Sequence, residues 1–227
     1  MLEIPKKKNG KKYDMEELRE IVEKLRGPGG CPWDREQTHY TLIKPMIEEA
    51  YEAVDAIEKN DTAKMTEEFG DVLLQVLFHA SVAQENGEFD LDDITDRCAQ
   101  KMLSRHTHIF GTQHADNPDE ALANWEAAKI KEKGFTSLYQ DLTDIPEVFP
   151  ALMRAQKAAK KIRKAGAAES DISGESTVFP GNTDFSDEKQ VGRLLYEICR
   201  RAEECGVECE LALKRETDEV IRSKKES

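Results

Sequence analysis

The chain has 227 residues, which is enough for one large domain or two small ones. Charged residues make up 35% of it and aromatic residues only 7%, a composition that suits a helical, soluble protein. The formal net charge of −13 argues against general binding to nucleic-acid backbones, which requires a basic surface. A polyanionic ligand would therefore have to bind to local cations, because the electrostatic field of the whole molecule repels it.

The N-terminus shows no secretory signal, because Met1–Pro5 is followed by three lysines and not by an apolar stretch. No apolar run in the sequence is long enough to cross a membrane. The cysteines are odd in number and scattered, which favours free thiols in a reducing environment. We therefore expect a cytoplasmic protein that does not associate with a membrane.

The first predicted helix runs from Met15 to Leu25, after a basic tail at residues 1–14. The segment 27–34 is so rich in Gly and Pro that it should be a defined loop and not a helix. Trp33 lies in this loop. It either plugs the end of the core or lines a ligand pocket.

Two acidic helices are predicted next, from Thr41 to Ile57 and from Met65 to about Gln84. Because the turn between them is short, they should pack antiparallel. At about 100° per residue, the first helix separates an acidic face from an apolar face. The acidic face carries Glu48, Glu49 and Glu52, and the apolar face carries Ile47, Tyr51, Val54 and Ile57.

The second acidic helix carries Glu68 and Asp71 one turn apart, and it is apolar nearly all round after Asp71. Such a helix is typically buried. Carboxylates at the mouth of a buried helix, facing further carboxylates, repel each other and lose solvation. A cation should hold them, and hard oxygen ligands in this number favour Mg²⁺ or Mn²⁺. The alternative is an ordinary solvated acidic face.

Three more helices are predicted before residue 165: Leu91–Arg105, Asp119–Lys133 and Ala151–Lys164. The first should be capped by Asp90 or Asp92. Residues 134–150 should be irregular, because prolines interrupt them.

Two basic residues stand out in these helices. Arg105 could address a phosphate or a base, and a structural role at the helix end is the alternative. Lys129 should bring positive charge close to the acidic centre, unless it is an ordinary surface lysine.

The C-terminal part should contain a long mobile loop at 166–186 and a helical pair at about 188–205 and 208–222. It faintly repeats the second acidic helix, with Gln190 and Arg193 in place of the two acids. The second copy should therefore be unable to hold Mg²⁺ in the same way.

An ordered set of motifs in residues 15–165 resembles MazG, a family of nucleoside triphosphate pyrophosphohydrolases in the all-α NTP pyrophosphatase superfamily. The motifs are Gly30-Cys31-Pro32-Trp33-Asp34 with Gln37-Thr38, Glu48-Glu49-x-x-Glu52 followed by Glu68-x-x-Asp71, Arg105-His106-x-His108-x-Phe110, Trp125-Glu126-x-x-Lys129, and the helix from Ala151 to Lys157. The chain departs from the family pattern at Ser104, at Thr107, at Gly166–Glu169 and in the missing C-terminal acids.

The resemblance implies an all-α fold, with a four-helix-type bundle formed across a homodimer. It also implies a catalytic helical domain at 15–135, an interdomain segment and helix at 136–165, and a degenerate second half at 187–227. The implied reaction is Mg²⁺-dependent hydrolysis of a nucleoside triphosphate between the α and β phosphorus atoms, which yields the monophosphate and pyrophosphate. Mn²⁺ is a possible substitute for Mg²⁺.

The resemblance also assigns roles to residues. Glu49, Glu52, Glu68 and Asp71 are the expected Mg²⁺ ligands. Glu48 is either a further ligand or, in a catalytic pair with Glu49, the base that orients the attacking water. The expected substrate contacts are Trp33, Lys44, Arg105, Lys129 and Lys157.

Two alternatives belong to other functional classes. A di-iron carboxylate bundle uses Glu-x-x-His pairs, whereas here the second motif ends in Asp71 and His79 lies two turns further on. The other alternative is a helical module that binds nucleotides or a partner protein without catalysing a reaction. The complete acidic set in the N-terminal half argues against that module.

Overall fold

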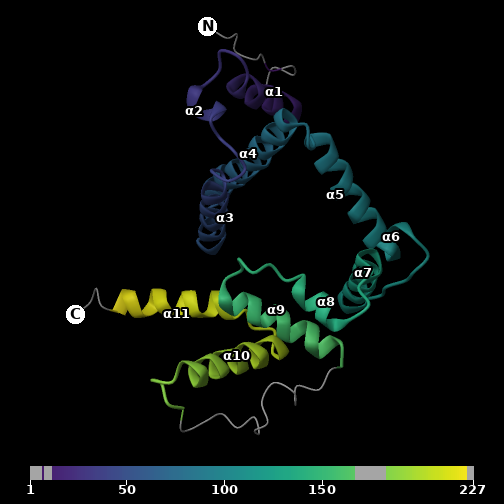
Figure 1. Cartoon of the computed structure of the whole chain (residues 1–227), viewed down its shortest axis with the longest axis vertical. Coiled ribbons are helices and arrows are strands. Elements are labelled where there is room, and N and C mark those ends of the chain that lie inside the picture. The colour runs from purple at the N-terminus through teal and green to yellow at the C-terminus, as the bar shows by residue number, and fades with distance from the viewer. Residues whose placement is uncertain (1–6, 8–11, 167–182, 224–227) are drawn as a thin grey trace. The chain divides into compact units, whose positions relative to one another are not determined.

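Every regular element in the described residues is a helix, as the sequence predicted (Figure 1). The computed structural model describes residue 7 and the ranges 12–166 and 183–223. The chain divides into two compact units, Met1–Trp125 and Glu126–Ser227. Most of the predicted tail and most of the predicted loop at 166–186 lie outside the described residues, and the predicted domain boundaries stay a prediction.

The first unit contains α1 (Met15–Arg26), α2 (Pro32–Arg35), α3 (Ile43–Glu58), α4 (Thr62–Asn86), α5 (Leu91–Arg105) and α6 (Thr107–Phe110). Helix α7 (Pro118–Lys133) continues from the first unit into the second. The second unit also contains α8 (Leu138–Thr143), α9 (Ala151–Lys164), α10 (Glu188–Glu204) and α11 (Cys209–Ser223).

Capping residues explain where the long helices begin and end. Asp61 caps α4, because its side chain accepts a hydrogen bond from the backbone N–H of Lys64. Helix α4 ends at Gly87, whose φ of 71° is readily adopted by glycine. Asp90 caps α5 and forms a capping box with Asp93, which decides between the two candidates for this cap.

Three short helices, α2, α6 and α8, lie where the sequence predicted none. Pro32 occupies the first turn of α2, where its fixed φ suits the helix and its missing N–H is not needed. Ser137 caps α8 by accepting a hydrogen bond from the Gln140 N–H. The expectation that 27–34 excludes helix is therefore wrong for Pro32–Arg35, and 134–150 is not irregular throughout.

Helices α3 and α4 form an antiparallel hairpin, as predicted. His39, which precedes α3, contacts His79 late in α4, whereas Glu49 further along α3 meets residues early in α4. The core of the unit forms where the C-terminal half of α4 packs against α1. It consists of Val22, Leu42, Leu77, Phe78 and Val82.

The hairpin is less buried than the sequence suggested. In α4 the segment 77–83 is buried except for two half-buried positions, but residues 72–74 are half-buried and Phe69 is exposed. On α3, the apolar residues Ile47 and Tyr51 are 51% and 58% exposed in the single chain. The expected burial after Asp71 therefore holds for most of 77–83, where α1 packs against α4, and is only partial at 72–74.

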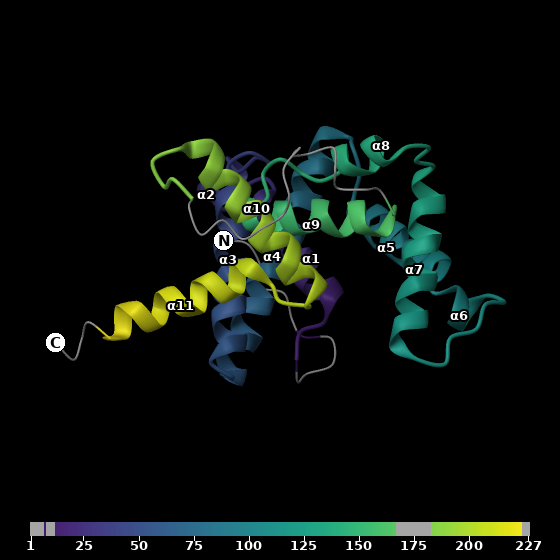
Figure 2. The same cartoon turned by 90° about the horizontal axis from the view of Figure 1, so that it is seen from below.

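In the second unit, α9 packs against α10: the two helices are neighbours in Figure 1 and cross each other in the view of Figure 2. The buried Gln156 of α9 holds the turn between α10 and α11. Its Nε2 donates to the Val207 carbonyl at 2.7 Å, and its Oε1 accepts from the Cys209 N–H at 2.8 Å. The predicted C-terminal helical pair is thus present, with its turn tied to α9.

All five cysteines are free: Cys31, Cys98, Cys199, Cys205 and Cys209. Within the part of the chain that the structure describes, no helix combines the length and the apolar character that a membrane crossing requires.

Candidate functional site

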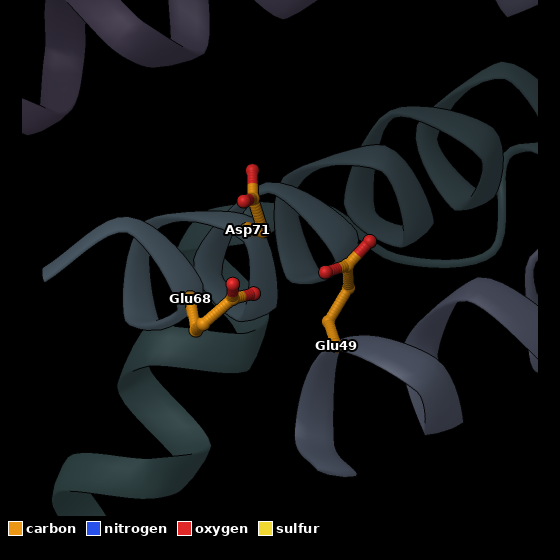
Figure 3. Close-up of side chains that lie close together, drawn as sticks. All are labelled: Glu49, Glu68 and Asp71. Atoms are coloured by element: carbon orange, nitrogen blue, oxygen red, sulfur yellow. The ribbon is translucent and has the colours of Figure 1, made fainter. Parts of the chain in front are cut away.

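Three carboxylates converge where α3 passes the N-terminal half of α4. Glu49 comes from α3, and Glu68 and Asp71 come from successive turns of α4 (Figure 3). One carboxylate oxygen of each lies within 4.8 Å of those of the other two. The antiparallel hairpin therefore brings together one acid from the first motif and both acids from the second.

Burial and mutual repulsion raise the pKa of Glu49. Desolvation is the largest cause, and the negative charges of Asp71, Glu52, Glu68 and Glu48 follow in that order. Glu48 and Glu52 are exposed and lie outside the group of three, but both act on Glu49 through their charge. All five predicted acids therefore contribute to one electrostatic cluster.

Two lysines contact this cluster. Lys64 Nζ lies 2.5 Å from Oε1 of the buried Glu68, and this hydrogen bond raises the pKa of Lys64. Sequence reasoning missed this contact, although the i, i+4 spacing was a signal for it. Lys44, a predicted substrate contact, lies 3.1 Å from Glu48 and is itself exposed.

The donor set fits a hard divalent cation. Glu49, Glu68 and Asp71 offer only carboxylate oxygens, the ligand type that Mg²⁺ and Mn²⁺ prefer. The three acids are also partly or fully withdrawn from water, so their repulsion is only weakly screened. A bound cation would relieve that repulsion.

Trp33 is anchored at the other end of α4. The buried Arg26 donates to the backbone carbonyl of the adjacent Asp34 and bonds Glu85 through Nη2 at 2.7 Å. Glu85 follows Asp71 by 14 residues (85 − 71), which is about 21 Å along a helix. Trp33 is 62% exposed, so it does not plug the core.

The remaining predicted contacts are placed as follows. Arg105 is buried at the end of α5, and its guanidinium lies 5.2 Å from the ring centre of Trp125. Lys129 is half-buried on α7, in the second unit. Lys157 lies on α9 of the same unit, with its ammonium 5.2 Å from the ring centre of Phe149. Their roles as substrate contacts stay predictions.

In the second unit, Gln190 donates to its own helix cap, Asp187, and Arg193 is exposed. Among the described residues of that unit, no three acids converge as they do in the first. The described part of α10 therefore offers no equivalent of the acidic group.

Comparison with known proteins identifies the family. Residues 37–110, which include the whole acidic cluster, match the MazG nucleotide pyrophosphohydrolase domain. The chain is 35% identical over 222 residues to the "Nucleoside triphosphate pyrophosphohydrolase" of Escherichia coli (strain K12). This match covers 92% of this chain and 84% of that protein.

Two further relatives extend the comparison. The "Nucleoside triphosphate pyrophosphohydrolase/pyrophosphatase MazG" of Thermotoga maritima is 36% identical over 214 residues, which cover 91% of this chain and 82% of that protein. The "Uncharacterized protein YabN" of Bacillus subtilis (strain 168) is 45% identical over 148 residues, which cover 65% of this chain but only 30% of that longer protein.

Among solved structures, the "Crystal structure of mazG-related protein from Thermotoga maritima" is 33% identical and has a TM-score of 0.44. It covers 51% of this chain and 98% of its own. The sequence matches alone span most of this chain and most of two named relatives. The chain therefore belongs to the MazG nucleotide pyrophosphohydrolase family.

Proposed function

We propose that this protein hydrolyses nucleoside triphosphates between the α and β phosphorus atoms, releasing the monophosphate and pyrophosphate. The observation that carries the proposal is the convergence of Glu49, Glu68 and Asp71 in the α3–α4 hairpin. The hairpin lies inside the segment that matches the MazG domain. Relatives named as nucleoside triphosphate pyrophosphohydrolases support the reaction class.

The acids would hold a divalent cation, Mg²⁺ first and Mn²⁺ as a substitute. Glu49, Glu68 and Asp71 form the centre of the donor set, and we assign Glu52, which lies on the next turn of α3 and outside this group, as a further ligand. When bound, such a cation would neutralise charge on the triphosphate and make a coordinated water more acidic. Glu48, exposed at the edge of the cluster, serves either as a further ligand or as the base that accepts the proton of the attacking water.

The triphosphate also needs positive side chains, because the net charge of −13 repels it. We assign this role to Arg105 and Lys129, with Lys44 and Lys157 as further contacts. Trp33 stays a prediction as a substrate contact: its anchor at Glu85 lies about 21 Å along α4 from Asp71, which is further than the base of a nucleotide held at the acids of the same chain can reach.

We also propose that the protein acts as a homodimer in the cytoplasm. Ile43, Ile47 and Tyr51 form an exposed stripe at i, i+4 and i+8 along α3. A second copy that covers this stripe would complete a four-helix arrangement around the acids. The free thiols support a reducing compartment.

The test is a panel of ribo- and deoxyribonucleoside triphosphates, each incubated with the protein with and without Mg²⁺. Pyrophosphate and orthophosphate are measured separately, together with the nucleotide product. We expect equal amounts of pyrophosphate and monophosphate, and only when Mg²⁺ is present. The order of rates across the panel then identifies the preferred base and sugar.

Other outcomes would contradict the proposal in distinct ways. Release of orthophosphate without pyrophosphate would mean that a different bond is cut. Tight nucleotide binding without any product would favour a non-catalytic binding module. Iron binding with oxidase activity would favour a di-iron protein.

A further inference from the structure

Lys64 makes an ion pair that neither the acidic motif nor the predicted substrate contacts include. Its ammonium lies 2.5 Å from Glu68 Oε1 and 3.5 Å from Glu67 Oε2. The Glu68 side chain is only 2% exposed, whereas the Lys64 side chain is 44% exposed. One end of the pair is thus fixed inside the hairpin, and the other end can move into solvent.

Local helix preferences do not explain this lysine. Lys64 lies in the first turn of α4, and its backbone N–H is fixed by the cap residue Asp61 at 3.0 Å. A positive charge is unfavourable near a helix N-terminus, where the partial charge of the backbone is also positive. A lysine four residues before a glutamate is also the less favourable order for a helical ion pair. The favourable contacts that remain are those with Glu67 and Glu68, of which the contact with the buried Glu68 is the shorter.

Glu68 needs a counter-ion. It is 1% exposed and shares the acidic group with Glu49 and Asp71. A carboxylate that loses its water and faces like charges must be neutralised by a cation in contact with it. Lys64 provides one from within the chain.

We propose that Lys64 is the built-in counter-ion of the acidic cluster: it neutralises Glu68 while no metal is bound, and a divalent cation displaces it on binding. This inference rests on the metal site of the proposed function. Lys64 and the metal compete for the same carboxylate, so the lysine keeps the metal-free site folded and lowers its affinity for the metal. The partial exposure of Lys64 lets the displaced ammonium move into water.

The hairpin also contains a matched control. Lys59 and Asp55 are likewise four residues apart, and their charged atoms lie 2.6 Å apart. The Lys59 and Asp55 side chains are 69% and 49% exposed, and neither residue belongs to the converging group of carboxylates. Removing Lys59 changes the net charge of the hairpin by the same amount, without changing any contact of Glu68.

The experiment uses the full chain stripped of metal and titrated with Mn²⁺, with bound Mn²⁺ measured by electron paramagnetic resonance. Lys64→Met should bind Mn²⁺ about tenfold more tightly than the wild type, because the competing charge is gone. Its metal-free melting temperature should fall by about 5 °C, and saturating Mn²⁺ should remove that difference. Lys64→Arg should keep the wild-type affinity, and so should Lys59→Met.

The outcomes separate this inference from the proposed function. Equal or weaker Mn²⁺ binding by Lys64→Met would overturn the inference alone. Wild-type protein that binds no Mn²⁺ would overturn the metal site, and the inference with it. If Lys64→Met is unfolded without metal, folding on addition of Mn²⁺ supports the counter-ion role, and failure to fold in Mn²⁺ overturns it.

Discussion

At the scale of single residues, substitutions of Asp71 and Glu52 test the proposed metal site. Asp71 is half-buried and offers one of the three converging oxygens, and Glu52 adds negative charge from α3. Asp71→Ala or Glu52→Ala should lower pyrophosphate release at least about 100-fold, because each removes a proposed metal ligand. Circular dichroism should show unchanged helix content. Full activity in either variant would disprove the assigned site.

Glu49 carries a charge that folding disfavours. Its pKa is raised by desolvation and then by the neighbouring acids, so its ionised form is less stable in the folded chain than in the unfolded chain. Glu49→Gln should therefore raise the metal-free melting temperature by about 2 °C while it lowers activity at least about 100-fold. The exposed Glu36→Gln serves as a control that should change neither quantity.

The direction in which folding shifts the pKa of Glu49 determines how the stability gain of Glu49→Gln depends on pH. A carboxyl group with a raised folded-state pKa stabilises the fold when protonated, below its unfolded-state pKa, and this contribution is lost as the pH rises through the folded-state pKa. The gain from Glu49→Gln should thus be present at neutral pH and vanish below about pH 4. A gain that persists or grows in acid would contradict this account.

At the scale of elements, Gln156 ties α9 to the turn between α10 and α11. Both of its hydrogen bonds end on backbone groups of that turn, at Val207 and Cys209. Gln156→Leu should destabilise the second unit by about 2 kcal/mol, because buried backbone groups lose their partners. Hydrogen exchange should become faster in α10 and α11 and stay unchanged in α3 and α4. Equal effects in both units would contradict this local role.

Glu197 stabilises α10 through two arginines. Hydrogen bonds and charge from Arg200 and Arg201 lower the pKa of Glu197 to about 2. A lowered carboxyl pKa stabilises the fold above the unfolded-state value of 4.5, and this stability is lost as the pH falls toward 2. Glu197→Gln should therefore be less stable than the wild type to urea at pH 7, and the difference should shrink between about pH 4.5 and about pH 2.

A control for Glu197 is the exposed pair of Lys214 and Asp218 on α11. Exposed ion pairs contribute little to stability. Asp218→Asn should therefore change urea stability by less than about 0.5 kcal/mol at pH 7. If Glu197→Gln and Asp218→Asn lost equal stability to urea, the greater burial of Glu197 would not explain its contribution.

At the scale of the whole molecule, the exposed stripe on α3 predicts association. Ile47→Glu combined with Tyr51→Glu should shift the mass measured by light scattering to that of one chain, 25.7 kDa. Val148→Glu, which changes a 92% exposed residue of the second unit, should leave the mass unchanged. A wild-type monomer with full activity would contradict the homodimer.

Much of the fold could be predicted from local signals. Apolar periodicity, the C-cap signal at Gly87 and the candidate cap Asp90 placed the long helices within a few residues, because such signals act inside one or two turns. The cap at Asp61 was missed, and α4 begins at Thr62 and not at Met65. The short helix at Pro32–Arg35 was missed, because Gly and Pro usually interrupt helices and only the local backbone shows that Pro32 begins one.

The sequence by itself determined the helical class and the family, and it identified the acids, because periodicity and motif spacing are properties of the chain alone. The tertiary structure decided which acids meet: it brought Glu49 to Glu68 and Asp71, and it placed the Lys64 ammonium on Glu68. It also anchored Trp33 about 21 Å along α4 from Asp71. Distances across a hairpin depend on how two helices pack, and burial depends on which other helices cover them, so neither can be read from spacing along one chain.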